Sequence, residues 1–89
     1  MARYVWWSTA ARRVIESLRP EHRREFDGII EAIAVSPEPV PGLSTIKAIE
    51  FFGQRKFRYF DNDFPYMIFY RIDEEGDINI ELVLAAFVT

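Results

Sequence analysis

The fold is decided by residues 64–73, Phe64-Pro65-Tyr66-Met67-Ile68-Phe69-Tyr70-Arg71-Ile72-Asp73. Aromatic and β-branched residues dominate this stretch and turn-forming residues flank it, which is typical of a strand inside an antiparallel meander. Before it, residues 55–60 alternate in character and end at a turn over 61–63, and after it a turn over 74–77 leads into an apolar run. We therefore expect residues 64–73 to form the middle one of three consecutive strands, within a sheet-forming region 55–84.

Because successive side chains of a strand point to opposite sides, these three strands predict a sheet with two unlike faces. The face expected to meet the rest of the chain is apolar and carries Phe57, Tyr59, Tyr66, Ile68, Tyr70, Ile72, Ile78, Ile80, Leu82 and Leu84. The opposite face mixes charged and apolar side chains, namely Lys56, Arg58, Met67, Phe69, Arg71, Asn79, Glu81 and Val83. Function should be sought on this second face.

The chain before the meander predicts a short strand and two helices. Residues 3–7 have the composition of a strand, and Ser8 or Thr9 suits the cap of a following helix. Apolar residues recur at helical spacing over 11–18, and Pro20 suits the first turn of a second helix, which ends before residue 36. Two short amphipathic helices with almost no loop between them predict a hairpin that covers one face of a sheet.

The segment between the helices and the meander is less regular. Residues 36–45 hold three prolines and a glycine, which indicates an extended connector. Residues 46–52 have no clear strand pattern, although Gly53-Gln54 suits a tight hairpin turn with glycine first. The expected fold is α+β, in the order β-α-α-β-β-β, with a helical hairpin packed on one face of a small antiparallel sheet.

Length and composition indicate a single soluble domain over residues 1–89. Hydrophobic residues make up 49% of the chain and aromatic residues 16%, enough for a packed core. The chain has no cysteine and one histidine, His22, so we expect neither a metal site nor a cofactor. No signal peptide and no membrane span are expected, which points to the cytoplasm. The net charge of −3 argues against general affinity for nucleic acid, although Arg55, Lys56 and Arg58 form a local basic cluster.

The predicted order of elements, together with the pattern Phe64-Pro65-Tyr66-x-Ile68-x-Tyr70-Arg71-Ile72, resembles the RelE/ParE superfamily of toxins from type II toxin–antitoxin modules. The resemblance covers nearly the whole chain. The opening Val5-x-Trp7-Ser8-x-x-Ala11 is similar to the start of these proteins, and the Phe-Pro-Tyr…Tyr-Arg-Ile segment is closer to the ParE-like branch.

The resemblance implies two kinds of toxin, both silenced by a cognate antitoxin. RelE-type members are ribosome-dependent mRNA endonucleases, whereas ParE members inhibit DNA gyrase. Lys56 and Arg58 match two basic residues of the RelE active face, but Met67 stands where RelE has a catalytic arginine. The final strand runs out in an apolar end, residues 84–89, where relatives continue with a basic segment. These departures favour a ParE-like toxin that acts by binding over a RelE-like nuclease, and a non-toxic binding or oligomerising module is a third hypothesis.

Candidate site residues follow from these hypotheses. Contact with a target or with phosphate is expected from Lys56, Arg58, Arg71 and Glu81, and the alternative is a solvated face on which the cations pair with Glu81. Contact with a partner is expected from Arg12, Arg13, Met67, Phe69, Val83 and Phe87. The apolar run 82–88 also suggests an edge strand that pairs with another chain, including a second copy in a homodimer, and the alternative is a fully buried last strand.

Overall fold

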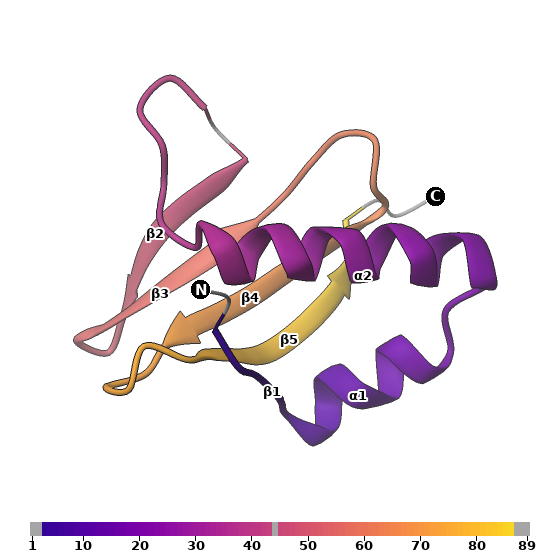
Figure 1. Ribbon diagram of the computed structural model, residues 1–89, viewed down its shortest axis with the longest axis horizontal. Coiled ribbons are helices and arrows are strands. Elements are labelled where there is room, and N and C mark those ends of the chain that lie inside the picture. The colour runs from indigo at the N-terminus through magenta and orange to yellow at the C-terminus, as the bar shows by residue number, and fades with distance from the viewer. Residues whose placement is uncertain (1–2, 44, 87–89) are drawn as a thin grey trace.

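Two helices cover one face of a five-stranded sheet in the computed structural model, which describes residues 3–43 and 45–86 (Figure 1). In chain order the elements are β1 (Val5–Trp7), α1 (Thr9–Glu16), α2 (Pro20–Val35), β2 (Ile46–Phe51), β3 (Gln54–Tyr59), β4 (Tyr66–Ile72) and β5 (Ile78–Ala85). The α+β class and the placement of both helices on one face are as predicted.

Both helices begin where the sequence indicates. The side chain of Ser8 accepts a hydrogen bond from the backbone N–H of Ala11 at 3.0 Å, which satisfies one of the free N–H groups at the start of α1. Pro20 occupies the first turn of α2, where its missing N–H leaves no helical hydrogen bond unmade. Local capping chemistry therefore sets both helix starts.

The sheet has the strand order β1-β5-β4-β3-β2, and it is mixed rather than purely antiparallel. β1 runs parallel to β5, with Val5 opposite Ile78 and Trp7 opposite Ile80, whereas the other neighbours are antiparallel. β5 lies between β1 and β4 only over Ile78–Ile80. Among the described residues, 82–85 pair with β4 alone, so the pairing of the run 82–88 with another chain stays a prediction. Local patterns cannot show which strand β1 joins, because its partner lies more than 70 residues away.

β2 is a full strand, one more than the predicted order contains. Its six residues pair with β3 from Ile46 opposite Tyr59 to Phe51 opposite Gln54. The hairpin turn is Phe52-Gly53, one residue earlier than expected, and both residues have positive φ, 51° and 76°. Two positive φ angles are the mark of a type I′ turn, whose twist suits the right-handed twist of paired strands.

A β-bulge reverses the alternation of β5 and overturns part of the predicted face assignment. Phe69 lies opposite Leu82 but Tyr70 lies opposite Ile80, so Glu81 is an extra residue without a partner in β4. Beyond this residue every side chain of β5 changes face. Val83, expected on the open face, is only 1% exposed in the core, whereas Leu82 and Leu84, expected in the core, are 37% and 42% exposed.

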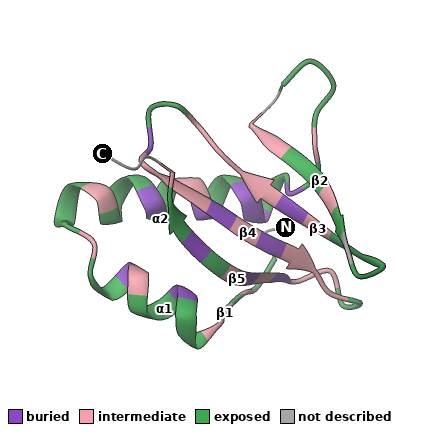
Figure 2. Cartoon of the chain, turned by 180° about the vertical axis from the view of Figure 1, so that it is seen from behind, coloured by how far each residue is buried: buried purple, intermediate pink, exposed green. Residues whose placement is uncertain are grey.

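The core lies between the helices and the sheet. Figure 2 shows buried residues along β4 and β5 and on the sides of α1 and α2 that face them. The largest fully buried side chains are Tyr70, Phe26, Phe64, Ile33, Ile68, Ile78, Ile80 and Val83. Aromatic contacts link the layers, with ring centroids 5.7 Å apart for Trp7 and Phe26 and 6.2 Å apart for Phe26 and Phe64. Within residues 3–43 and 45–86, this packing leaves the other face of the sheet without a helix.

Candidate functional site

The uncovered side of the sheet, which we call the open face, carries charged and apolar side chains together. Residues directly opposite each other in antiparallel strands share a face, and the pairs Lys47–Arg58, Ile49–Lys56 and Arg58–Phe69 connect three strands across it. The described residues of its strands are Trp6, Lys47, Ile49, Gln54, Lys56, Arg58, Met67, Phe69, Arg71, Asn79, Glu81, Leu82 and Leu84. Four of these are cations and one is a carboxylate.

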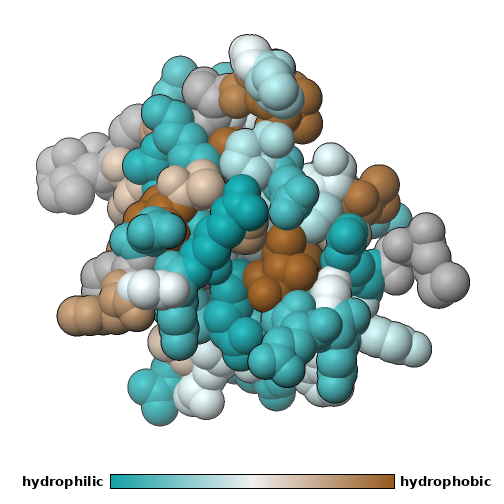
Figure 3. Space-filling view, turned by 90° about the vertical axis from the view of Figure 1, so that its left-hand side faces the viewer, coloured by the Kyte–Doolittle hydropathy of each residue, from teal (hydrophilic) through white to brown (hydrophobic). Residues whose placement is uncertain are grey.

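Figure 3 views the end of the molecule at which the β2–β3 and β4–β5 turns lie. Its surface is mostly hydrophilic, and hydrophobic patches stand isolated among the polar side chains.

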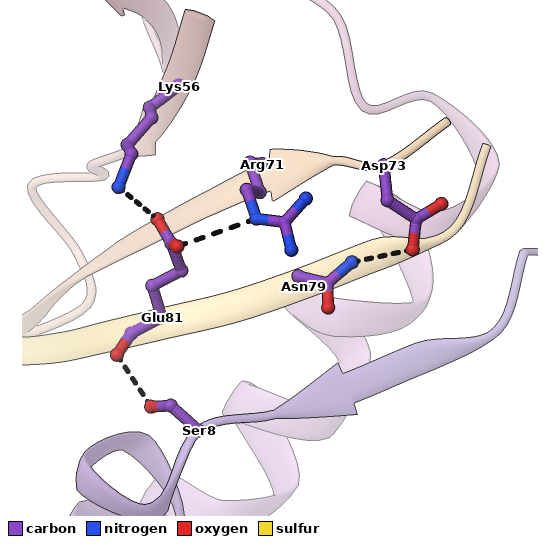
Figure 4. Close-up of polar contacts among 6 residues, drawn as sticks. All are labelled: Ser8, Lys56, Arg71, Asp73, Asn79 and Glu81. Carbon is purple, nitrogen blue, oxygen red and sulfur yellow. Dashed lines mark hydrogen bonds and ion pairs between the residues drawn. The ribbon is translucent and has the colours of Figure 1, made fainter. Parts of the chain in front are cut away.

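Glu81 holds two cations of the open face (Figure 4). Its Oε1 lies 2.7 Å from Nζ of Lys56, and its Oε2 lies 3.6 Å from Nε of Arg71. The three side chains are 25–40% exposed, so their ion pairs are only partly screened by water. Three of the four residues predicted to contact a target or phosphate thus form one cluster.

The bulge fixes the position of Glu81. The hydroxyl of Ser8 donates a 2.6 Å hydrogen bond to the backbone carbonyl of Glu81, the residue whose backbone the bulge takes out of register with β4 (Figure 4). The same Ser8 hydroxyl caps α1. One serine therefore ties the bulge to the helix layer and holds Glu81 on the open face.

Arg58 occupies a neighbouring hollow of about 390 Å³ between β2 and β3. Thr45, Lys47, Phe60, Asp61 and Asn62 line this hollow with it. Its Nε is buried and has no hydrogen-bond partner among the described residues, so the arginine keeps a free donor. Of the three cations predicted to contact a target, Lys56 and Arg71 pair with Glu81, whereas Arg58 lies apart in this hollow.

The β4–β5 turn is a separate acidic group next to Arg71. Asp73, Glu75 and Asp77 have carboxylate oxygens within 4.8 Å of one another, so among the described residues they form the group that could hold a cation. Asp73 already accepts hydrogen bonds from the side chain of Asn79 at 2.8 Å and from two backbone N–H groups of the turn. The Asn79 hydrogen bond is the largest of the causes that lower the pKa of Asp73. These bonds account for the cluster as turn structure.

The predicted partner-contact residues do not form a single surface. Arg12 and Arg13 are exposed on α1, on the helix side of the sheet, while Met67 and Phe69 are half-buried on the open face. Val83 is buried in the core and cannot contact a partner, because the bulge turns it inward. Phe87 lies outside the described residues.

The prediction missed four residues of the open face, Trp6, Lys47, Ile49 and Gln54, and placed two on the wrong side, Leu82 and Leu84. Lys47 and Ile49 belong to β2, whose irregular pattern did not specify a strand. Leu82 was assigned to the core because strict alternation was extended through the bulge. A single sequence holds no clear signal for the bulge, although a charged Glu81 between two apolar residues is compatible with one.

Nothing in the described part of the chain is a helix of the length and apolar character needed to cross a membrane.

No family model matches the chain, and no curated protein matches it. Several solved structures do match the chain. The chain is similar to the RelE–RelB complex of the archaeon Pyrococcus horikoshii, with a TM-score of 0.76, 18% identity and 100% of both chains covered. It is also similar to the RelBE2 toxin–antitoxin complex of Mycobacterium tuberculosis, with a TM-score of 0.73, 22% identity and 96% and 99% of the two chains covered. The isolated RelE toxin of E. coli aligns with a TM-score of 0.66 and 14% identity, over 99% of this chain and 88% of that one.

These similarities show that the chain has the fold of RelE toxins, as the sequence resemblance implied. They do not distinguish the ParE-like branch.

Proposed function

We propose that this protein is the toxin of a type II toxin–antitoxin pair, that its open face binds the cellular target, and that a cognate antitoxin neutralises it. The fold supports the toxin assignment, since the similar structures are a RelE toxin and RelE–RelB complexes. We choose the open face as the target-binding surface because Lys56, Arg58 and Arg71 all lie on it, whereas both helices lie on the other side of the sheet. Fold alone does not specify activity, so the target has to be inferred from the residues of the open face.

The chemistry of the open face favours binding over cleavage. Cutting RNA through the 2′-hydroxyl requires one group that accepts a proton and another that donates one. Among the described residues of the open face, Glu81 is the carboxylate, and its oxygens face Lys56 and Arg71. Both carboxylate oxygens are thus engaged in ion pairs within the protein, rather than directed at a substrate hydroxyl. The centre of the face holds Met67 and Phe69, which can contact a protein but cannot transfer a proton.

We therefore propose DNA gyrase as the target to test first, in line with the closer resemblance to the ParE-like branch. Purified gyrase should lose supercoiling activity as the protein is added, and a Lys56→Gln/Arg71→Gln double variant should inhibit at least about tenfold less, because two charged contacts are lost. Arg13→Gln removes an exposed charge on the helix side and serves as the matched control. Full supercoiling activity at saturating protein would remove gyrase as the target.

A ribosome-dependent mRNA endonuclease is the second candidate. The observation in its favour is that Lys56, Arg58 and Arg71 lie on one face with a carboxylate, an arrangement that could hold a phosphate and stabilise its developing charge. Toeprinting on translating ribosomes tests it. New cleavage sites within open reading frames that disappear in the Lys56→Gln/Arg71→Gln variant would replace the gyrase proposal, whereas intact transcripts would eliminate the nuclease.

A further inference from the structure

An apolar hollow of about 420 Å³ lies on the open face beside the Glu81 cluster. Four strands contribute to it, and its lining residues are Ile49, Lys56, Phe69, Glu81 and Leu82. Ile49, Phe69 and Leu82 supply its apolar lining, and Lys56 and Glu81 bring charge to it. A hollow of this size and composition can take one bulky apolar side chain and orient it through a few polar groups.

The bulge in β5 creates this combination. In a regular strand Glu81 and Leu82 would point to opposite faces, but the extra residue lets both lie on the open face, where both line the hollow. An acid and a large apolar residue thus stand next to each other, and the apolar one, Leu82, lies opposite Phe69. Leu82 is left 37% exposed, an arrangement that contributes little to the core and suits contact with another molecule.

The charges around the hollow are arranged for a carboxylate. Lys56 and Arg71 each approach a different oxygen of Glu81, at 2.7 and 3.6 Å. The protein's own side chain therefore occupies a position that an external carboxylate could take. The described strand residues of the open face carry four cations against this one carboxylate, although the whole chain has a net charge of −3. An acidic ligand would be attracted locally by this face.

We propose that this hollow is the docking site for an acidic peptide segment of the neutralising partner. A bulky apolar side chain of that segment enters between Ile49, Phe69 and Leu82, and an adjacent carboxylate replaces Glu81 on Lys56 and Arg71. The inference rests on the proposed function in taking the partner to be the antitoxin. Glu81 then acts as an internal competitor that keeps the two cations paired in the free protein.

A peptide fits these observations better than a nucleic acid. The apolar lining of Ile49, Phe69 and Leu82 distinguishes the two ligands, because a phosphate backbone has no apolar side chain to fill it. The apolar lining supplies the energy of binding, and the charge pair supplies specificity for an acidic sequence.

The test is an NMR titration of the purified protein with two short blocked peptides. One has a central leucine flanked by aspartate and glutamate, and its match has asparagine and glutamine at those positions. The acidic peptide should bind about tenfold more tightly, because charge pairs close to an apolar contact contribute on that order, and its shifts should centre on Ile49, Phe69 and Leu82. Equal affinity for both peptides would overturn the proposal.

Three variants sharpen the result. Glu81→Gln should tighten binding of the acidic peptide about three- to tenfold, since the internal competitor loses its charge. Leu82→Ala should weaken it about fivefold through lost apolar contact. Leu84→Ala is the control, because Leu84 is similarly exposed on the same strand but does not line the hollow.

Weaker binding by Glu81→Gln, or an equal effect of Leu82→Ala and Leu84→Ala, would contradict the proposed site. Tighter binding of an oligouridylate than of the acidic peptide would also overturn it in favour of RNA. The titration contains no gyrase or ribosome, so it is independent of the supercoiling and toeprinting assays that test the proposed function.

Discussion

Replacing Tyr70 by phenylalanine tests how the connector between helices and sheet is held. Tyr70 lies in the middle of the core, fully buried, and its hydroxyl donates a 2.6 Å hydrogen bond to the buried backbone carbonyl of Pro37. Tyr70→Phe keeps the ring but leaves that carbonyl without its partner. A buried acceptor that loses its hydrogen bond costs about 1–3 kcal/mol in the free energy of unfolding.

The same change has a calculable effect on thermal stability. A chain of 89 residues has an unfolding entropy of about 0.19 kcal/mol/K near its midpoint, so a loss of about 2 kcal/mol lowers Tm by roughly 10 °C. Calorimetry or circular dichroism measures the shift. The control is Tyr66→Phe in the same strand. Tyr66 is half-buried, its hydroxyl makes no hydrogen bond within the described residues, and we expect a change of less than about 0.5 kcal/mol in the free energy of unfolding.

Alkaline pH provides a second measurement of Tyr70. Burial raises the pKa of Tyr70 above the ordinary value of 10.0. The folded state therefore keeps the proton longer than the unfolded state, and stability falls as pH rises above 10.0. Tyr70→Phe should flatten this decline. A Tm for Tyr70→Phe within about 1 °C of the wild type would refute the reasoning, because it would mean that the connector carbonyl does not depend on this hydroxyl.

Three further predictions test other parts of the structure. Val83→Ala should lower the free energy of unfolding by about 2 kcal/mol in urea, while Leu84→Ala changes it little, and the reverse order would contradict the bulge. Phe52→Asn should raise the free energy of unfolding by on the order of 1 kcal/mol and Tm by a few degrees, because asparagine adopts positive φ more readily than phenylalanine. A lower Tm would show that the contacts of Phe52 stabilise the fold by more than its backbone strain costs. The pKa of Asp73, measured by NMR, should lie below 3.8 and should rise in the Asn79→Ala variant. Asp73 therefore stabilises the fold above pH 3.8, and its contribution disappears as pH falls through its folded-state pKa. An unchanged pKa of Asp73 in the variant would remove Asn79 as the main cause of the shift.

Sequence reasoning succeeded where the determining chemistry is local. Ser8 and Pro20 start their helices as predicted, because caps and proline act within one turn of the chain. The two turns that bound β4 were also placed correctly, since clusters of aspartate, asparagine and glycine mark them.

Sequence reasoning failed where the structure of a strand depends on a partner far away in the sequence. β1 joins β5 across the whole length of the chain, and β2 is specified mainly by its pairing with β3. The bulge at Glu81 is likewise a property of the β4–β5 pair, so a strict period of two misplaced every later residue of β5.

The difference between local signals and distant pairing also explains which parts of the candidate site were predicted. Lys56, Arg58, Arg71 and Glu81 were assigned to one face from alternation, and the structure brings three of them together. The neighbouring hollow could not be foreseen, because it needs Ile49 from the unpredicted strand and the side-by-side placement of Glu81 and Leu82.

Growth of a bacterial culture after induction of this protein without an antitoxin tests directly whether the protein is a toxin that acts through its open face. We expect growth arrest by the wild type and by the Arg13→Gln control. Near-normal growth is expected with the folded Lys56→Gln/Arg71→Gln variant, because its open face has lost two charges. Undiminished growth with soluble, folded wild-type protein would contradict the account and favour a non-toxic binding module, and arrest by the double variant would show that toxicity arises from another surface.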